Sequence, residues 1–253
     1  MFLRRKLTVM ATVALLSTSL LAGCSSSGEN SNGGSNGGGT ATAAEVLANK
    51  NARAAISMII DNQAYCDVIL NNGSIPTSTF TPRGLAFDNG KDYTDLTEGM
   101  GYEYNEEQAK ELWKKAKEEV GFDTVEIELL TYDHDLGKRT GEYIQSELSD
   151  LEGLTVKVSN LPFKQKLEKE TKGEFDLAFS GWGADYPDPL TYLATMQTGN
   201  QFANQTGYKS DEYNKLVEEA KKLPTTEAYA KYAEAEKLML EDGYLAPINQ
   251  KAG

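Results

Sequence analysis

Along the middle of the chain, segments with the helical spacing of apolar residues alternate with segments that have the apolar pattern of strands. Apolar residues recur with helical spacing between Asn105 and Gly121, where Ala109, Trp113 and Ala116 share one face. Three later segments have the apolar pattern of strands, and helical patterns separate them. The predicted strands are 124–130, 154–158 and 175–179, and the predicted helices between them are 137–150 and 162–172. This order predicts an α/β fold with two βαβ units, and hence parallel strands joined by right-handed crossovers.

The regions on either side of this core follow other patterns. Asn51 is predicted to cap a helix that turns Ile56 inward. Prolines and glycines interrupt residues 72–89, which indicates a long extended loop. Helical patterns return after the third strand, and residues 244–248 are predicted as a short terminal strand at the edge of a sheet.

The first residues have the pattern of an export signal. A positive segment at Arg4 precedes an apolar run over 7–21, which is too short for an ordinary membrane span. The run ends in Leu-Ala-Gly-Cys, which resembles a bacterial lipobox. That resemblance implies a signal peptide over 1–23 and a lipid on Cys24. The alternative is an ordinary cleaved signal with an incidental cysteine.

The segment after Cys24 is rich in glycine, serine and asparagine, so residues 24–44 are predicted to be a flexible tether. The folded part is predicted to span 45–253, which suits one domain, or two small ones, with a hydrophobic core. A tether behind a lipid would hold this part at the extracytoplasmic face of the cell membrane. Cys66 would then be the remaining cysteine, and it is expected to be a small buried apolar residue.

Composition restricts the possible functions. The formal charge is −13, which argues against nucleic acid as a partner. The single histidine, His134, lacks the further ligands that a metal site requires, and no nucleophile elbow or phosphate-binding glycine loop is found. The sequence therefore predicts neither an enzyme nor a metal or organic cofactor. A hydrolase that uses clustered carboxylates stays a minor alternative, with no residue to support it.

Residues 179–189, FSGWGADYPDP, hold the strongest signal for ligand binding. They follow the third predicted strand, and ligands of open α/β sheets collect at the carboxyl ends of strands. Gly181 and Gly183 lack a Cβ, so a ligand backbone could approach closely. Trp182 and Tyr186 offer flat apolar surfaces, which would form one wall of the site.

The two aspartates of this segment have different expected roles. Asp188 precedes Pro189, and that pair is typical of a helix N-terminus, so a structural role is expected for Asp188. The sequence suggests no such structural role for Asp185. Its carboxylate could hold a cation by charge-assisted hydrogen bonds, or it could be a solvated loop acid.

GWGADYPDP at the end of a strand resembles the signature of extracytoplasmic oligopeptide-binding proteins of ABC importers, which form solute-binding family 5. Further pieces match in order and spacing from about residue 44 to about residue 250. These pieces are NKNARAAISMIIDNQAYCDVILNNGSIP, YEYNEEQAKELWKKA, QSELSDLEGLTVKV and GYKSDEYNKLVEEA. The resemblance implies a two-lobed clamshell that closes on a peptide.

The resemblance also implies roles for single residues. Asp185 matches the aspartate that binds the free α-amino group of the peptide, and Trp182 matches the signature tryptophan. Neighbouring residues such as Tyr186 would line side-chain pockets, while Gly183 stands where the family varies. The implied partners are short peptides with a free N-terminus and the permease subunits of an ABC transporter.

The chain departs from the family in extent. Sequence typical of the middle of such proteins follows the tether directly, so the expectation is a single lobe, truncated at both ends, that binds weakly by itself. The alternative is a surface lipoprotein that acts as an interaction module and pairs with another chain.

Overall fold

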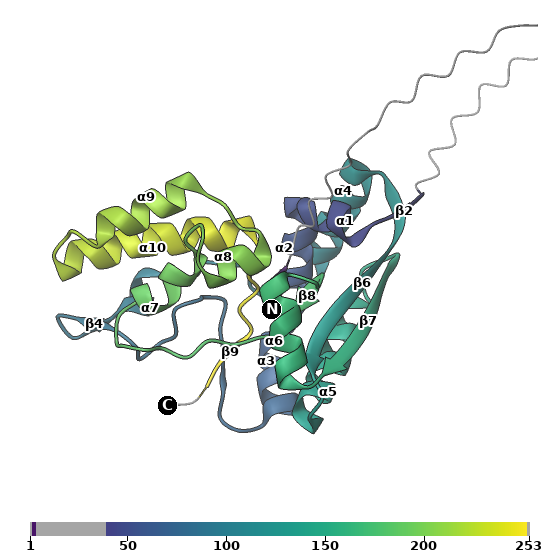
Figure 1. Ribbon diagram of the computed structural model, residues 1–253, viewed down its shortest axis with the longest axis horizontal. Helices are drawn as coiled ribbons and strands as arrows, with labels where there is room; N and C mark the ends of the chain where they lie inside the picture. The colour runs from purple at the N-terminus through teal and green to yellow at the C-terminus, as the bar shows by residue number, and fades with distance from the viewer. Residues whose placement is uncertain (1, 4–38, 252–253) are drawn as a thin grey trace, which may run out of the picture.

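The computed structural model describes residues 2–3 and 39–251 (Figure 1). Within them, a sheet with its helices lies beside a second, helical body, and the chain passes between the two more than once. The lipidation prediction at Cys24 lies outside the described residues. Beyond a two-residue strand at Phe2–Leu3, regular structure begins with strand β2 (Gly39–Ala41) and helix α1 (Ala43–Ala48), slightly before the predicted boundary at residue 45.

Strand β6 (Phe122–Tyr132) is the centre of the main sheet. Strand β7 (Leu154–Leu161) pairs with it in parallel over most of its length. On the opposite side, β2 pairs in parallel with the first half of β6, and β8 (Leu177–Ala178) pairs in parallel with the second half. The short β1 (Phe2–Leu3) lies antiparallel to β8. The predicted α/β class and the parallel strands are confirmed.

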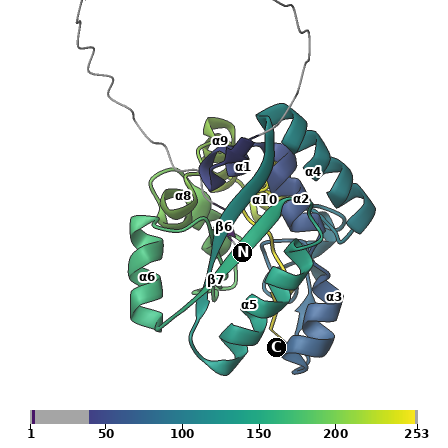
Figure 2. The same ribbon diagram turned by 90° about the vertical axis from the view of Figure 1, so that its right-hand side faces the viewer.

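Helices provide the two crossovers that the sequence predicts, as Figure 2 shows. Helix α5 (Asp135–Leu148) joins β6 to β7, and α6 (Phe163–Lys172) joins β7 to β8. Strand β8 is shorter than the predicted strand because Asp176 interrupts the ladder: its carboxylate accepts the N–H of Glu128 at 3.0 Å.

The first helices pack against the sheet. Helix α2 (Lys50–Met58) buries Ile56 as predicted, but the expected cap at Asn51 is wrong. The cap is Asn49, whose side-chain oxygen accepts the N–H of Ala52 at 3.1 Å. The cause is a break of the helical chain at Asn49, where extended backbone separates α1 from α2.

Helix α4 (Glu106–Val120) begins and ends where the sequence predicts. The side chain of Asn105 accepts the N–H of Gln108 at 3.0 Å, and Gly121 closes the helix with a positive φ of 81°. Trp113 packs edge-on against Phe122 with 5.6 Å between ring centroids. This contact fixes α4 to the start of the central strand.

A short helix α3 (Asn62–Ala64) continues into a π-helical turn over Tyr65–Leu70. Cys66 in this turn is buried, as predicted, and burial raises the pKa of its thiol. Asn71 ends the turn with a positive φ of 42°.

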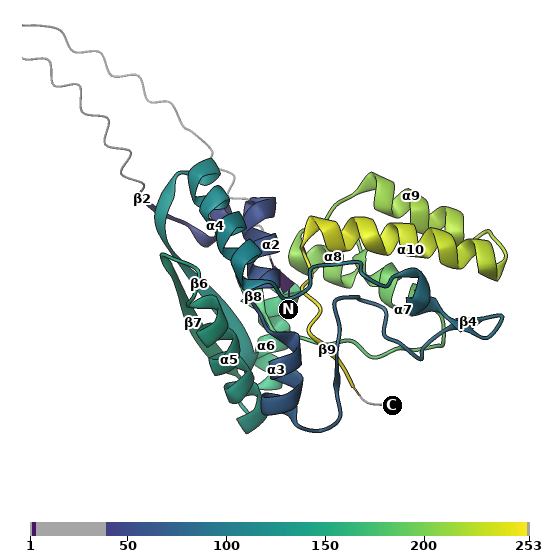
Figure 3. The ribbon, with the colours of Figure 1, turned by 180° about the vertical axis from the view of Figure 1, so that it is seen from behind.

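The predicted long loop is largely extended and carries short strands. Strand β3 (Ile75–Pro76) pairs with β9 (Asn249–Gln250), and β4 (Phe87–Asp88) forms a hairpin with β5 (Lys91–Asp92). A 3₁₀ turn at Tyr93–Leu96 follows. The long loop therefore joins the two bodies of the molecule (Figure 3).

The terminal strand predicted over 244–248 is wrong, because pairing with β3 begins only at Asn249. Pro247 has no N–H to donate to a ladder. Leu245 and Ile248 bury their side chains, but between Tyr244 and Ile248 the backbone forms only an isolated bridge at Leu245.

The helical body contains the later part of the chain. Its elements are α7 (Leu190–Leu193), a 3₁₀ turn at Ala194–Met196, α8 (Gln201–Thr206), α9 (Asp211–Ala220) and α10 (Thr225–Asp242). Buried Tyr and Met side chains between these helices form a second hydrophobic core, separate from the core around the sheet. No helix among the described residues is both long enough and apolar enough to cross a membrane.

Candidate functional site

The loop 179–189 leaves the sheet at the carboxyl end of β8 and leads to α7 in the helical body (Figure 1). The N–H of Phe179 donates to the carbonyl of Leu130 at 2.9 Å, which is the last bond that ties this segment to β6. The loop therefore bridges the two bodies, starting at the sheet edge where the sequence predicted the site.

Trp182 is fixed by three contacts. Its indole N–H donates to the carbonyl of Thr191 at 3.0 Å, and its own carbonyl accepts the hydroxyl of Tyr192 at 3.3 Å. Its ring meets Phe202 edge-on, with 5.5 Å between centroids. The indole is therefore held both by the hydrogen bond of its N–H and by the contact of its ring, and it can form a rigid wall of the site.

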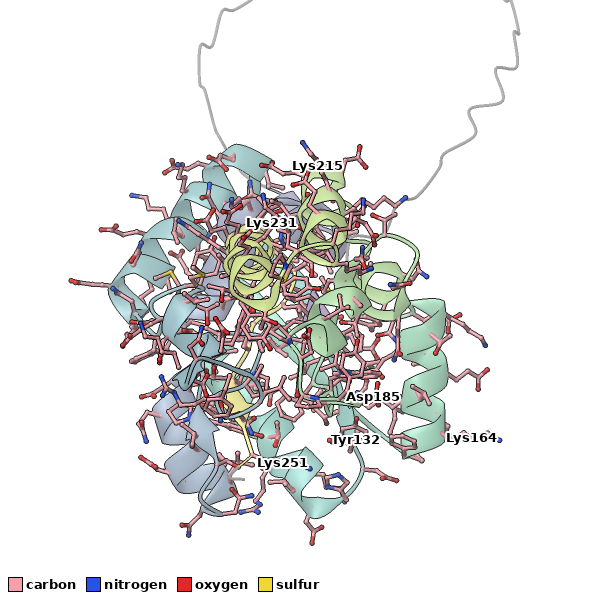
Figure 4. The ribbon with its side chains drawn as sticks, turned by 90° about the vertical axis from the view of Figure 1, so that its left-hand side faces the viewer. Tyr132, Lys164, Asp185, Lys215, Lys231 and Lys251 are labelled. Atoms are coloured by element: carbon pink, nitrogen blue, oxygen red, sulfur yellow. The ribbon has the colours of Figure 1, made fainter. Side chains whose placement is uncertain are left out.

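Asp185 lies exposed on the face shown in Figure 4. Its backbone N–H donates to the hydroxyl of Thr191 at 3.0 Å, so the backbone at this position is fixed. Its carboxylate forms no ion pair and no side-chain hydrogen bond with any described residue. Because the carboxylate has no internal partner among the described residues, it is available to a cation from outside.

Tyr186 and the two glycines are open to solvent beside Asp185. Tyr186 is 45% exposed, and partial burial, with the charges of Asp188 and Asp185, raises the pKa of its hydroxyl. A Cβ added at Gly181 or Gly183 would meet nothing within 4 Å. The described residues thus provide no steric reason for glycine at either position, which leaves space for a ligand in front of both.

Asp188 has the structural role that the sequence predicts. Its carboxylate accepts the N–H of Leu190 at 2.8 Å, and its carbonyl accepts the N–H of Thr191 at 3.1 Å. The regular helix α7 begins one residue later than expected, after Pro189. Of the two aspartates, Asp188 is occupied by the helix start and Asp185 is not.

A buried charged cluster, which the sequence did not reveal, supports the base of the loop. The Lys166 ammonium lies 2.5 Å from Glu170 and 2.6 Å from the hydroxyl of Ser180, which also donates to Glu170. The ammonium also lies 4.4 Å from the centre of the Tyr132 ring. Burial lowers the pKa of Lys166, and Glu170 opposes this shift. The i,i+4 spacing of Lys166 and Glu170 on α6 could have indicated this pair from the sequence, but the same spacing is equally typical of a solvated helix face.

A cavity of about 210 Å³ lies beside the loop, and we call it the Trp182 cavity. Its walls come from β6, α6, the loop and α8. The residues that form most of its apolar surface and its polar base are Tyr132, Phe163, Leu167, Trp182, Phe202 and Gln205. Sequence analysis missed all of them except Trp182, because they are far apart along the chain.

His134 caps helix α5. Its Nδ1 accepts the N–H of Gly137 at 3.0 Å, and its ring stacks on Tyr132 with 5.5 Å between centroids. No group of three or more histidine, cysteine, aspartate or glutamate side chains in the described part of the chain is placed to hold a metal ion. The role observed for His134 is therefore structural.

Comparison with known proteins identifies the family. Residues 29–204 match the family model described as bacterial extracellular solute-binding proteins, family 5, middle. The chain belongs to this family. The predicted resemblance is thus confirmed, and the parallel sheet with flanking helices is the fold of a family 5 lobe.

Curated family 5 members include a dipeptide-binding protein of Lactococcus lactis, which is 31% identical over 217 residues. This match covers 83% of the present chain but 39% of the Lactococcus protein. The periplasmic oligopeptide-binding protein OppA of Salmonella typhimurium is 28% identical, with 78% of this chain and 36% of that protein covered. The chain thus spans well under half the length of these relatives.

Solved structures of family 5 proteins agree with the fold. Listeria monocytogenes OppA bound to peptide superposes with a TM-score of 0.76 at 35% identity, over 81% of this chain and 40% of that one. A peptide-binding protein of a peptide ABC transporter gives a TM-score of 0.76 at 36% identity. In that case the match covers 82% of this chain and 93% of the solved chain.

Proposed function

We propose that this chain provides a ligand-binding lobe of an oligopeptide-binding component of an ABC peptide import system. The observation that carries the proposal is Asp185: an exposed carboxylate on a fixed backbone, with no internal partner among the described residues. Asp185 binds the α-ammonium group of a short peptide, since a carboxylate and an ammonium form strong charge-assisted hydrogen bonds.

The surroundings of Asp185 suit a peptide rather than a bare cation. Trp182 and Tyr186 offer flat surfaces in the same loop, and the space in front of Gly181 and Gly183 admits a peptide backbone. A small metal ion would require several oxygen ligands at once, and Asp185 contributes only one carboxylate.

The comparisons support this proposal through the names of the relatives, several of which bind dipeptides or oligopeptides. One of the similar solved structures is bound to a peptide. Since the chain spans about two-fifths of the length of those proteins, import through permease subunits is proposed for this chain by analogy.

We also propose a location at the extracytoplasmic face of the cell membrane, through a lipid on Cys24. Several family members are described as periplasmic, which supports an extracytoplasmic site of action. Incorporation of radiolabelled palmitate into the wild type, lost in Cys24→Ala and kept in Cys66→Ala, would support the anchor. Equal labelling of all three would refute it.

The amino-group role is tested by titrating trialanine and its N-acetylated form against the wild type and Asp185→Asn, with NMR signals of the loop as the readout. We expect the wild type to bind trialanine roughly 2- to 5-fold more tightly than the acetylated peptide, because acetylation removes the charge that Asp185 binds and an exposed ion pair contributes at most about 1 kcal/mol. In Asp185→Asn that preference should disappear.

Asp123→Asn is the matched control, since Asp123 is an exposed acid at the opposite end of β6. This variant should retain the wild-type preference. Equal binding of the two peptides by the wild type would overturn the proposed role of Asp185.

A further inference from the structure

Thr191 contacts both Trp182 and Asp185. Its side-chain hydroxyl accepts the backbone N–H of Asp185 at 3.0 Å, and its carbonyl accepts the indole N–H of Trp182 at 3.0 Å. We propose that Thr191 is a positioning residue of the peptide amino-group site: its hydroxyl determines where the Asp185 carboxylate lies, without touching the ligand. This inference rests on the proposed function, because it assigns a positioning residue to Asp185.

The Thr191 hydroxyl is not needed by its own helix. Thr191 lies inside α7, and Asp188 caps the start of that helix by accepting the N–H of Leu190. A threonine hydroxyl inside a helix commonly bonds a carbonyl three or four residues earlier. Among the described residues, the Thr191 hydroxyl forms no such bond, and it accepts the N–H of a residue six positions earlier, outside the helix. The hydroxyl therefore serves the loop.

The side chain of Thr191 is held in place by its surroundings. It is 4% exposed, and a β-branched side chain has few rotamers. The next residue, Tyr192, is also buried and packs edge-on against Phe80, with 5.3 Å between centroids. The carbonyl of Leu193 accepts the hydroxyl of the buried Tyr213 at 2.7 Å. Helix α7 is thus fixed to the helical body, and Thr191 connects the loop to this fixed helix.

Asp185 has few other restraints. Among the described residues, the bond to Thr191 is the one hydrogen bond that Asp185 forms. A Cβ at Gly183 would meet nothing within 4 Å, and Tyr186 is 45% exposed, so packing restrains this part of the loop little. Glycine also leaves the backbone conformationally free. Without the Thr191 hydroxyl, the backbone at Asp185 would be free to adopt several conformations.

A fixed backbone at Asp185 favours binding of an ammonium group. The charge-assisted hydrogen bonds between a carboxylate and an ammonium group depend on distance and direction. Ordering an exposed loop at the moment of binding costs conformational entropy, and a site that is ordered beforehand avoids this cost. The Thr191 hydroxyl provides that order before the peptide arrives.

The two contacts of Thr191 can be separated by substitution. The bond to Asp185 uses the side chain, whereas the bond to Trp182 uses the main-chain carbonyl, which every residue has. Thr191→Val has nearly the same shape but lacks the hydroxyl, so it removes only the bond to Asp185. Thr191→Ser keeps a hydroxyl and should keep this bond. The Trp182 indole N–H signal in NMR spectra shows whether α7 and the first half of the loop are intact in each variant.

Thr195→Val is the matched control. Thr195 is 8% exposed, and its hydroxyl donates to the carbonyl of Tyr192 at 2.5 Å rather than bonding the loop. The substitution removes a buried hydroxyl four residues further along the chain. Any general effect of replacing a buried threonine by valine therefore appears in both valine variants, and an effect on Asp185 appears only in Thr191→Val.

We expect the Asp185 amide of Thr191→Val to exchange with water roughly 5-fold faster than in the wild type, because it loses its hydrogen bond. The roughly 2- to 5-fold preference for trialanine over its N-acetylated form should approach 1 in this variant, because the carboxylate is no longer ordered before binding. Thr191→Ser and Thr195→Val should keep the wild-type exchange rate and preference. The Trp182 indole signal should be unchanged in all three variants.

The inference is overturned if Thr191→Val keeps the wild-type preference, if Thr191→Ser loses it, or if Thr195→Val loses it equally. It is also overturned if Thr191→Val loses the Trp182 indole signal together with the preference, because the hydroxyl would then hold α7 as a whole. Each of these results leaves the proposed function in place. A wild type without any preference overturns the proposed function, and this inference with it.

Discussion

At the scale of single residues, Glu236 shows how the two bodies are joined. The side chain is fully buried on α10, yet it accepts hydrogen bonds from the N–H groups of Phe80 and Thr81 at 2.8 and 2.9 Å. The hydroxyls of Thr81 and Tyr93 donate to it at 2.7 and 3.0 Å. Burial raises the pKa of Glu236 despite these four donors. The long loop is thus held on α10 by one carboxyl group.

This shift predicts a pH dependence of stability. Since the pKa of Glu236 is raised in the folded state, the folded protein retains a proton that the unfolded chain releases. The resulting stabilisation is complete below the unfolded pKa of about 4.3 and is lost as pH rises through the folded pKa. We expect the free energy of unfolding of the wild type to fall relative to that of Glu236→Gln between about pH 4 and pH 7.

Urea unfolding at several pH values measures this difference. Glutamine cannot titrate, and its amide group can still meet the two backbone donors and the two hydroxyls. Glu234→Gln on the same helix is the control, because that side chain is 62% exposed and should show no such trend. A constant difference between wild type and Glu236→Gln across this range would contradict the prediction.

At the scale of elements, the helix caps explain which helices the sequence located correctly. Asn105 and Asn49 both accept a backbone N–H in the first turn of their helices, α4 and α2. Asn51 lies inside α2 and donates its side-chain amide to Glu119 at 2.8 Å on the exposed surface. Asparagine therefore has two different energetic roles at positions 49 and 51, which are only two residues apart.

We expect Asn105→Ala and Asn49→Ala each to lower the free energy of unfolding by about 1 kcal/mol. Asn51→Ala should cost less than half as much, because alanine favours the helix interior and the lost hydrogen bond is exposed. Chemical denaturation of the three variants measures their free energies of unfolding and so ranks the three effects. An effect of Asn51→Ala as large as that of Asn49→Ala would show that the cap assignment at Asn49 is wrong.

At the scale of the whole molecule, the site at Asp185 is open. The described residues leave this carboxylate exposed, so its interaction with an ammonium group is weakened by water and by salt. Clamshell receptors enclose their ligands between lobes, which removes the water. We therefore expect this chain by itself to bind trialanine in the millimolar range.

The openness of the site also predicts a strong dependence on salt. Binding of trialanine should weaken several-fold between about 0.01 M and about 1 M NaCl, as the screening length falls from about 30 Å to about 3 Å. The N-acetylated peptide keeps only its carboxylate charge, so its binding should show no such weakening as salt is added. Sub-micromolar, salt-independent binding of trialanine to the purified monomer would refute the open site.

The sequence by itself determined the βαβ order, the caps at Asn105 and Gly121, and the structural role of Asp188 at a helix start, because each depends on neighbours along the chain. It misplaced the terminal strand, since the pairing partner of Asn249 is β3, far away in sequence. Only the tertiary structure decided the Lys166–Glu170–Ser180 cluster and the Trp182 cavity. Burial turns an ordinary i,i+4 pair into the support of a loop, and a cavity exists only where separate elements meet.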